Sequence, residues 1–231
     1  MKELNLKHQP FAILKQTQNI QNMRIAVLFL FVTIITLSLG GCEQEVNSHQ
    51  SLRLPDTLYN YSAVKFPTYF HEKINGGLFE VSPFDNDNTP LDNPITDEGA
   101  TLGRVLFYDD NLSKNRTVSC ASCHQQAFAF SDGKALSTGL NDELTARNSP
   151  SLANNRFYVR KHYFMDERAE TLEDLILEPF KDPIEMDMSE ELLIGRILEQ
   201  SFYEDLFTDA FGDKTITTER ISKAISQFIR S

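Results

Sequence analysis

Apolar residues in the second half of the chain recur every three or four positions, the spacing that places side chains on one face of a helix. Leu102, Val105 and Leu106 follow this spacing after Thr96, a candidate N-cap whose next two residues are acidic. Acidic side chains in a first turn interact favourably with the helix dipole. The pattern therefore predicts a helix that begins after Thr96.

Capping residues and helix breakers predict the elements that follow. Ser149 and Pro150 are a candidate N-cap and first position of a short helix. A helix is expected over residues 167–177, and Pro179 is expected to end it. Ser189 is the candidate cap of the next helix, whose Leu192, Leu193 and Ile197 are expected to point inward.

Two more helices complete the prediction. Ser201 and Glu204 are a candidate capping box for a helix that Gly212 ends, and Thr218 opens the last helix. The inward face of this last helix is expected to hold Ile221, Ala224, Ile225 and Phe228. No stretch alternates between apolar and polar residues for the length of a strand. We therefore expect an all-α domain over residues 92–231.

Residues 43–92 show no sustained period and contain four prolines and a polar run at 85–88, so we expect an irregular extension. The aromatic residues of this segment indicate that parts of it pack onto the domain: Tyr59, Tyr61, Phe66, Tyr69, Phe70, Phe79 and Phe84. The expected organisation is a signal over residues 1–41, a tether and irregular extension over 42–91, and the domain over 92–231.

The N-terminal segment is typical of a secretory signal. An apolar run of 15 residues, 25–39, follows Met23 and Arg24 and ends before Gly40-Gly41-Cys42. It is shorter than the ~20 residues that span a bilayer. It resembles a bacterial lipoprotein signal, so we expect Cys42 to be lipidated and to hold the protein on a membrane in the periplasm. The polar stretch before Met23 is long for a signal, which makes Met23 a second candidate for the first residue.

Charge excludes one class of partner. The formal net charge is −11, and loss of residues 1–41 makes it more negative because they hold four basic residues and one acid. Nucleic acid phosphates would repel such a surface, so we expect no nucleic acid partner. A basic partner such as a small cytochrome is compatible with it.

The remaining two cysteines belong to Cys120-Ala121-Ser122-Cys123-His124, the spacing of a c-type haem attachment site. Cys120 and Cys123 would form thioethers, and His124 would ligate the haem iron. The second ring nitrogen of His124 is then expected to donate to a backbone carbonyl or a carboxylate. With Cys42 used for lipid, no cysteine remains for a disulfide.

A zinc site and a redox pair are weaker interpretations of these two cysteines. A zinc half-site would need a second pair of ligands, and no other CxxC, HxxxH or close histidine cluster occurs in the chain. A thioredoxin-like redox pair belongs in a βαβ pattern, whereas the flanking residues predict loop and helix. We favour one covalent haem c.

A series of short motifs carries a family resemblance. In order they are Leu102-Gly103-Arg104, Leu106-Phe107, Leu112-Ser113, residues 119–124, residues 147–152, residues 166–168, Leu172-Glu173 and residues 183–186. This order resembles the N-terminal haem domain of the bacterial di-haem cytochrome c peroxidase family, which includes the MauG-like enzymes. CxxCH alone has little family specificity, but the ordered set is specific, and it covers roughly residues 92–231.

The resemblance implies a cytochrome c-like haem domain. It also implies reduction of hydrogen peroxide to water at an open haem site, with electrons from a small cytochrome or similar donor. Glu185 matches the family's distal glutamate, which moves protons during cleavage of the O–O bond. Without the resemblance, Glu185 would be interpreted as a solvated acid in a loop. Arg168 is expected to pair with a haem propionate or an interface acid, or else to form a helix-surface salt bridge.

Three more residues have weaker assignments. Asn148 matches a family residue that helps to bind calcium between two domains. We favour an ordinary helix-entry asparagine there, because the other calcium ligands belong to a domain that this chain is expected to lack. His71 and His162 are expected to be surface histidines rather than second ligands of the iron.

Three departures from the family pattern matter. Leu140 stands where many members have a histidine that closes the site, so we expect an open site. Met165 replaces a tryptophan set between the two haems, and Leu175 replaces a glutamine. The chain stops at Ser231 within a predicted helix, before the family's second haem domain. The alternative to a peroxidase is therefore a non-catalytic mono-haem electron carrier or a truncated remnant.

Overall fold

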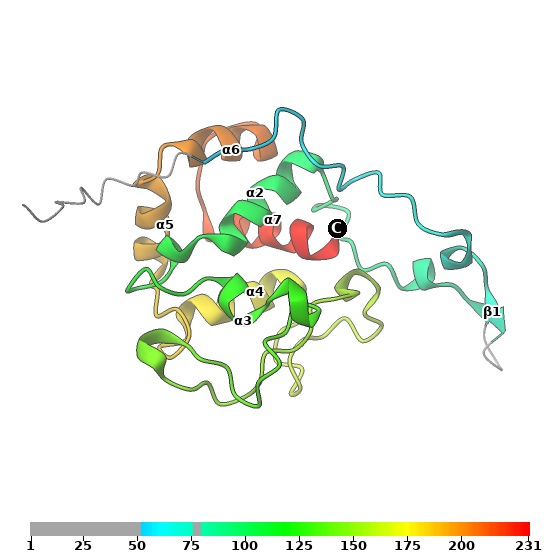
Figure 1. Ribbon diagram of the computed structural model, residues 1–231. Coiled ribbons are helices and arrows are strands. Elements are labelled where there is room, and N and C mark those ends of the chain that lie inside the picture. Colours follow the sequence, from blue (N-terminus) through cyan, green and yellow to red (C-terminus); the bar gives the residue numbers. More distant parts are fainter. Residues whose placement is uncertain (1–51, 76–79) are drawn as a thin grey trace, which may run out of the picture. The chain divides into compact units, whose positions relative to one another are not determined.

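The computed structural model describes residues 52–75 and 80–231, where helices form nearly all of the regular structure (Figure 1). These are α2 (Asp97–Tyr108), α3 (Cys120–Cys123), α4 (Leu172–Lys181), α5 (Glu190–Leu198), α6 (Phe202–Phe211) and α7 (Thr218–Arg230). Strands β1 (Ile74–Asn75) and β2 (Glu80–Val81) form a short antiparallel pair with Ile74 opposite Val81. Apart from this pair, the described residues have the predicted all-α class.

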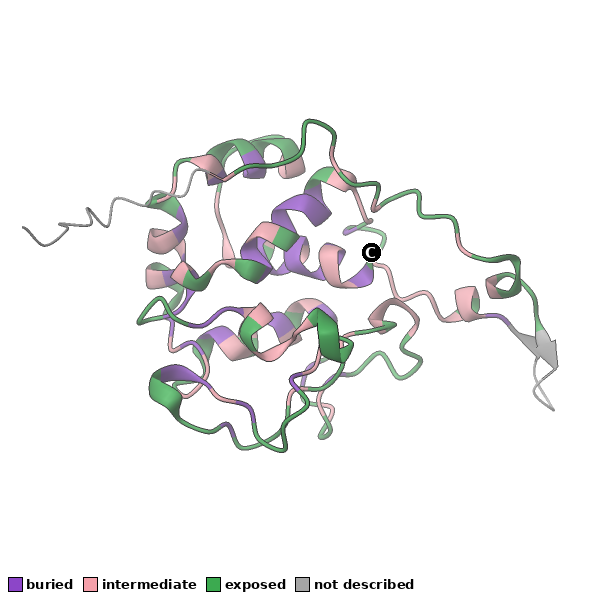
Figure 2. Cartoon of the chain, viewed as in Figure 1, coloured by how far each residue is buried: buried purple, intermediate pink, exposed green. Residues whose placement is uncertain are grey.

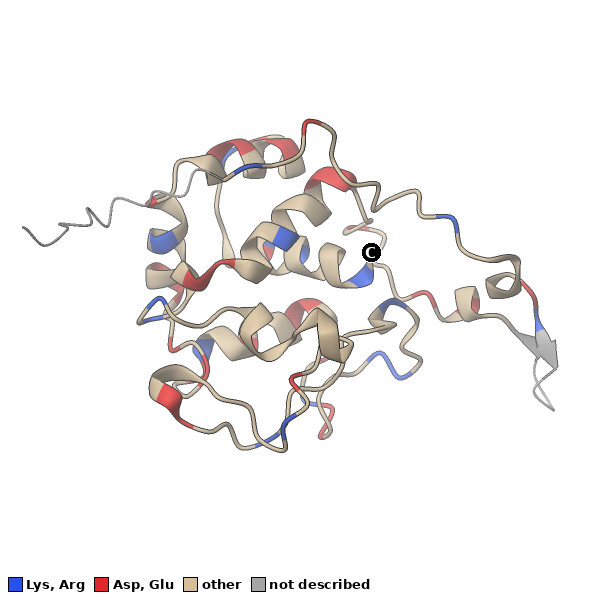
Figure 3. Cartoon of the chain, in the orientation of Figure 1, with Lys and Arg blue, Asp and Glu red and all other residues tan. Residues whose placement is uncertain are grey.

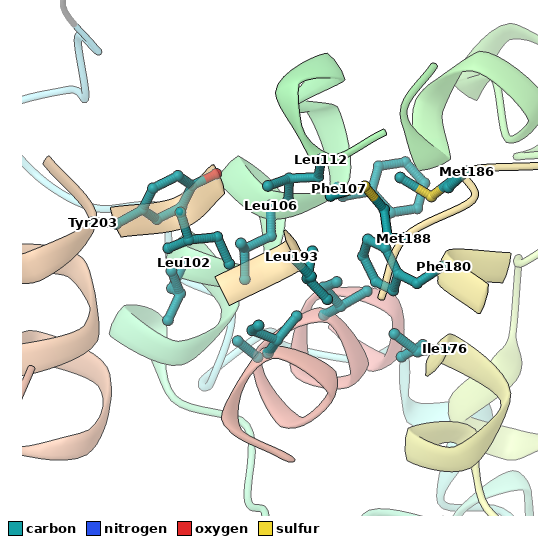
Figure 4. Close-up of a cluster of buried hydrophobic side chains, with 14 of the residues drawn as sticks. Leu102, Leu106, Phe107, Leu112, Ile176, Phe180, Met186, Met188, Leu193 and Tyr203 are labelled. Atoms are coloured by element: carbon teal, nitrogen blue, oxygen red, sulfur yellow. The ribbon is translucent and has the colours of Figure 1, made fainter. Parts of the chain in front are cut away.

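The core lies where α2 and α7 pack along each other (Figure 2). Leu102 and Leu106 of α2, and Ile221 and Ile225 of α7, are at most 1% exposed. The residues at this interface include those that the helical periodicity predicted. Side chains from α4, α5 and α6 extend the cluster, among them those labelled in Figure 4: Ile176, Phe180, Leu193 and Tyr203.

Gly103 sets how closely α2 and α7 approach. A Cβ atom at this position would lie 1.9 Å from the backbone oxygen of Ala224, which is far inside the contact distance of two atoms. Only glycine leaves room for this backbone. The two helices that hold the core together therefore meet main chain against main chain.

Most predicted helix starts are confirmed, with small shifts. The Thr96 hydroxyl accepts from the N–H of Gly99 at the start of α2, and the Ser189 hydroxyl accepts from the N–H of Leu192 at the start of α5. The last helix begins at Thr218, as predicted, but its cap is the preceding residue, Thr217. Side chains that satisfy the first N–H groups of a helix thus mark its start in the sequence.

The prediction for residues 167–177 was wrong at both ends. Glu167 has a positive φ of 56°, and α4 begins only at Leu172 after a capping box formed by Thr171 and Asp174. Pro179 lies inside α4 and does not end it. The last turn of α4 continues past this proline, because the N–H of Asp182 donates to the carbonyl oxygen of Glu178 at 3.1 Å.

Two capping predictions were also wrong. Ser201 precedes α6 but makes no side-chain cap, because its backbone is already helical (φ −57°, ψ −27°). Gly212 does end α6, with a left-handed φ of 84°. No helix follows Ser149, whose N–H and hydroxyl both bond the hydroxyl of Ser137, at 3.1 and 2.6 Å. These bonds tie Ser149 to a neighbouring loop and hold the backbone out of a helix.

The described part of the extension packs onto the domain through aromatic rings, as its composition predicted. Phe66 and Phe84 lie 5.6 and 5.5 Å, centroid to centroid, from the ring of Phe157. Beside them, Arg156 forms an ion pair of 2.7 Å with Asp87. Cys42, Met23 and Phe79 lie outside the described residues, so the lipid anchor and the signal stay predictions.

A buried ion pair joins α4 to α7. Arg230, only 4% exposed, donates to both carboxylate oxygens of Glu173, at 2.5 and 3.0 Å. Asn93 donates to the same carboxylate at 2.8 Å, and Arg230 also donates to Asn88 at 3.0 Å. Burial alone would raise the pKa of Glu173, but its bonds to Arg230 and Asn93 hold that pKa below its usual value.

Acidic side chains gather on α6 and on the first turn of α2, as Figure 3 shows. This distribution agrees with the negative net charge of −11. Among the described residues, none of the helices combines the length and the apolar character needed to cross a bilayer.

Candidate haem site

The two cysteines lie on a helix of one turn. In α3, the N–H of His124 donates to the carbonyl oxygen of Cys120 at 2.9 Å, and the Ser119 N–H donates to the Ser122 hydroxyl at 3.0 Å. Residues three apart lie on the same face of a helix. The two thiols are free and half-buried. The short helix therefore presents both thiols on one side, directly before the histidine.

His124 is held in one tautomer. Its Nδ1 lies 2.8 Å from the carbonyl oxygen of Phe130, so Nδ1 carries the proton and donates it. Burial lowers the pKa of His124, although the carbonyls of Phe130 and Pro150 oppose the shift. The imidazole is then neutral, with Nε2 as its free lone pair, and that is the form that ligates metals. The partner predicted for the second ring nitrogen is thus a backbone carbonyl.

A tight loop aims this carbonyl at His124. Ala129 and Phe130 both have positive φ, 54° and 59°, after a 3-10 turn over Gln126–Phe128. The loop is closed by two hydrogen bonds of 2.9 Å, from the N–H of Gln125 to Ser131 and from the N–H of Phe130 to Gln125. Sequence reasoning missed Phe130, because a carbonyl oxygen has no side-chain signature.

The residues fit a covalently attached haem c better than a redox pair or a zinc site. Burial raises the pKa of the Cys120 thiol to about 12 and also raises that of Cys123. Redox-active pairs have lowered thiol pKa values, and zinc binds thiolates. Within the described residues, no group of three histidine, cysteine or acidic side chains is placed to hold a metal ion. Two thiols beside a neutral, oriented histidine are the set that thioether attachment and iron ligation need.

Glu185 lies on a loop that packs against the loop over residues 137–145. The N–H of Leu140 donates to the carbonyl oxygen of Ile184 at 2.7 Å. A Cβ atom at Gly139 would lie 2.0 Å from the same oxygen, so this approach requires glycine. The Cys123 thiol lies 3.7 Å from the carbonyl oxygen of Thr138 in the same loop. The structure thereby brings Glu185 and the cysteine helix to one region.

The Glu185 carboxyl is half-buried, and its pKa is raised. Burial is the main cause, the charge of Asp182 adds to it, and the charge of Arg168 opposes it. The charge of Glu185 in turn helps to raise the pKa of both Cys120 and Cys123. The carboxyl therefore acts electrostatically on both thiols, and it holds its proton to higher pH than a surface glutamate.

Arg168 lies in an exposed loop rather than on the predicted helix. Its Nη1 donates to both oxygens of Asp166, at 2.9 and 3.1 Å, and its guanidinium carbon lies 3.5 Å from the centroid of the Phe164 ring. Its Nε is 4.0 Å from Glu178. Arg168 thus pairs with Asp166 in its own loop and lies within salt-bridge distance of Glu178 on α4, and contact with a propionate stays a prediction.

The remaining predicted residues are spread over the domain. Leu140 is buried, Leu175 is half-buried on α4, and Met165 is 91% exposed. Asn148 is exposed, and no helix begins directly after it, so the favoured helix-entry assignment was wrong. No described cluster of possible metal ligands surrounds it, and a role in calcium binding stays a prediction. The two histidines considered as second iron ligands, His71 and His162, are both exposed.

Comparison with known proteins identifies the family. The model of the di-haem cytochrome c peroxidase family matches residues 97–231, which is more than half of the chain. The chain belongs to this family. Membership implies a c-type haem, in agreement with the two thiols and the oriented His124.

The similar proteins include both MauG proteins and peroxidases. The chain is 36% identical to the methylamine utilization protein MauG of Methylophilus methylotrophus, over 64% of this chain and 43% of that protein. It is 31% identical to the cytochrome c551 peroxidase of Nitrosomonas europaea, over 58% of this chain and 40% of that protein. A solved MauG-like protein associated with microbial copper homeostasis matches with a TM-score of 0.57 and 33% identity, over 74% of this chain and 46% of that one. The chain thus spans about two fifths of the curated relatives it matches.

Proposed function

We propose that the chain is a haem c domain that takes part in the reduction of hydrogen peroxide to water, with electrons from a small cytochrome or similar donor. The observation that carries the proposal is the half-buried Glu185 carboxyl with its raised pKa, on a loop anchored beside the loop that contacts Cys123. Family membership and the peroxidases among the relatives support the same chemistry.

The residues have separate tasks. Cys120 and Cys123 would hold the haem covalently, and the neutral His124 would offer Nε2 to its iron, while the Phe130 carbonyl fixes the imidazole ring. When bound, the haem supplies an iron centre that binds peroxide and passes electrons to it. Reduction of one peroxide to two waters consumes two electrons and two protons. Glu185 takes a proton from one peroxide oxygen and gives a proton to the other, the work of a general acid–base group.

The test is the variant Glu185→Gln, which keeps the shape of the side chain and removes its titratable group. The reaction of the holoprotein with peroxide, followed by rapid mixing and absorbance, is expected to slow by about 10²–10⁴-fold. The matched control is Glu170→Gln, the same change at an exposed loop residue, which is expected to react like the wild type. Equal rates in all three proteins would instead favour a non-catalytic electron carrier.

We also propose that the haem site is open to peroxide. An aliphatic side chain cannot ligate iron, and Leu140 stands where many family members have a closing histidine. The ferric holoprotein should then show a high-spin spectrum without prior reduction. A low-spin spectrum with two strong protein ligands at neutral pH would contradict this.

The proposed location is the periplasmic side of a membrane, with a lipid on Cys42 as the anchor. Cys42→Ser should move the protein from the membrane fraction to the soluble fraction, because the variant loses the acyl chains that Cys42 would carry. Stable anchoring needs more than one acyl chain or signal. An unmodified bond between residues 41 and 42 in the mature protein, found by mass spectrometry, would rule the anchor out.

A further inference from the structure

Asp182, the residue after the last turn of α4, forms most of the hydrogen bonds that shape the Glu185 loop. Its carbonyl oxygen accepts from the N–H groups of Glu185, Met186 and Asp187, at 3.1, 3.2 and 2.9 Å. Its carboxylate oxygen Oδ1 accepts from the N–H of Ile184 at 2.8 Å. Four consecutive N–H groups, including that of Glu185, thus bond one residue.

Bonds from outside the loop fix it on both sides of Glu185. The Ile184 carbonyl accepts from Leu140, and the Met186 carbonyl accepts from the N–H of Lys114 at 2.9 Å. The side chain of Lys114 also forms an ion pair of 2.5 Å with Asp187, which has a positive φ of 51°. A left-handed conformation in a non-glycine residue costs about 1–3 kcal/mol, so it persists only where the surrounding structure holds it.

Asp182 also acts on the carboxyl that its loop presents. The Asp182 side chain is exposed, whereas Glu185 is half-buried, and the charge of Asp182 raises the pKa of Glu185. The other charge that acts on this carboxyl is Arg168, which lowers its pKa, and the charge of Glu185 in turn raises the pKa of the Cys120 and Cys123 thiols. Asp182 is therefore the neighbouring charge that helps Glu185 to keep its proton.

We propose that Asp182 is a positioning residue for Glu185, which folds the loop with its carbonyl and carboxylate oxygens and places a negative charge beside the Glu185 carboxyl. The proposal rests on the proposed function for its meaning in catalysis, because a group that both takes and gives a proton works best when its pKa lies near the operating pH. The hydrogen bonds of the loop and the titration of Glu185 can both be measured without peroxide.

Two variants separate the two tasks of Asp182. In Asp182→Asn the amide oxygen can still accept from the N–H of Ile184, but the charge is gone. In Asp182→Ala both are gone, and only the backbone carbonyl remains. Asp205→Asn, the same change on the exposed face of α6, is the matched control.

The first measurement is a pH titration of the Glu185 carboxyl in the full-length holoprotein by infrared difference spectroscopy, with the band assigned by its loss in Glu185→Gln. The midpoint should shift to lower pH in both Asp182 variants and stay unchanged in Asp205→Asn. Because the Asp182 side chain is exposed, high salt should reduce the shift. A wild-type midpoint for Asp182→Asn at low salt would overturn the electrostatic task.

The second measurement is hydrogen exchange of the amides of residues 184–187. Exchange should be faster than wild type in Asp182→Ala and unchanged in Asp182→Asn, since only the alanine variant loses the side-chain acceptor. Wild-type exchange in Asp182→Ala would overturn the loop-forming task. If Glu185→Gln leaves the peroxide reaction unchanged, the proposed function fails, and both measurements still decide the role of Asp182.

Discussion

Helices α2 and α7 meet along buried aliphatic and aromatic faces, whereas residues 113–171 are joined to one another mainly by hydrogen bonds. We call α2 and α4–α7 the helical half and residues 113–171 the loop half. Nine of the ten described non-glycine residues with positive φ lie in the loop half, from Arg116 to Glu167. Its buried residues are mostly polar or small, among them Ser113, Ser119, Asp132, Ser137 and Thr145.

The difference shows which half supplies stability and which supplies chemistry. Burial of apolar side chains is the main favourable term in folding, and the helical half holds most of the buried cluster. Left-handed backbone is costly, yet it aims the Phe130 carbonyl at His124. The loop half can place backbone atoms where a regular helix could not. The stability of the helical half offsets the cost of this left-handed backbone.

The largest expected effect is confined to the loop half. Cys120→Ser combined with Cys123→Ser should abolish covalent haem, because both thioethers are lost, while the far-ultraviolet circular dichroism of the helices is kept. A denaturing gel stained for haem and a circular dichroism spectrum measure the two results. Haem that stays bound through the gel would contradict the attachment site. Loss of the helical signal would show that the helical half depends on haem attachment in the loop half.

The next effect concerns the buried ion pair of the helical half. Glu173→Gln leaves the buried charge of Arg230 without a partner, which should lower the free energy of unfolding by about 3–5 kcal/mol. The control is Glu199→Gln, which breaks an exposed pair with Arg116 and should cost about 1 kcal/mol or less. Urea unfolding measures both. Equal losses would mean that burial does not distinguish the two pairs.

The same pair predicts a pH dependence. The pKa of Glu173 is lowered in the folded state, so its contribution to stability is present above the pKa of the unfolded chain and is lost as the pH falls through the folded value. The unfolding free energy of the wild type should therefore fall in acid. It should fall less steeply in Glu173→Gln, in which this group no longer titrates.

A smaller effect tests the close crossing of α2 and α7. Gly103→Ala places a methyl group against the Ala224 carbonyl, and such overpacking should cost about 1–3 kcal/mol. In contrast, a Cβ atom at Gly195 of α5 meets nothing within 4 Å, so Gly195→Ala should gain about 0.5–1 kcal/mol from helix propensity. Denaturant midpoints give both values, and a neutral Gly103→Ala would show that the crossing can relax.

The smallest effect asks how much single side-chain hydrogen bonds matter in the helical half. Ser189→Ala removes the cap of α5 and should cost about 1 kcal/mol. Ser201→Ala removes a side chain that makes no cap and should change stability by less than about 0.5 kcal/mol. The same unfolding curves compare the two, and a large loss in Ser201→Ala would contradict the absence of a cap.

The helical half was largely predictable from the sequence because its signals are local. Thr96 and Ser189 cap their helices through their own hydroxyls, and the buried faces follow the helical period. The capping box at Ser201 failed because the backbone there is already helical. That conformation depends on how α5 passes into α6, which no short pattern records.

The loop half was predictable only where covalent chemistry fixes the spacing, as in residues 120–124. The positive φ at Glu167 has no glycine to announce it, so residues 167–171 were wrongly assigned to a helix. Phe130 acts through its carbonyl oxygen, and Asp182 acts partly through its own; every residue carries such an oxygen. These carbonyl contributions come from the folded backbone and not from the residue type.

The raised thiol pKa of Cys120 has a consequence for the order of events during maturation. Because burial raises this pKa to about 12, the reactive thiolate is scarce in the folded α3 at pH 7. The folded α3 would then react slowly with haem vinyl groups, so attachment should come before the loop half closes. Alkylation of the unattached thiols should accordingly be much faster in urea than in buffer, and equal rates would contradict this order. The rate at which the fold is completed would then limit the time available for cofactor loading.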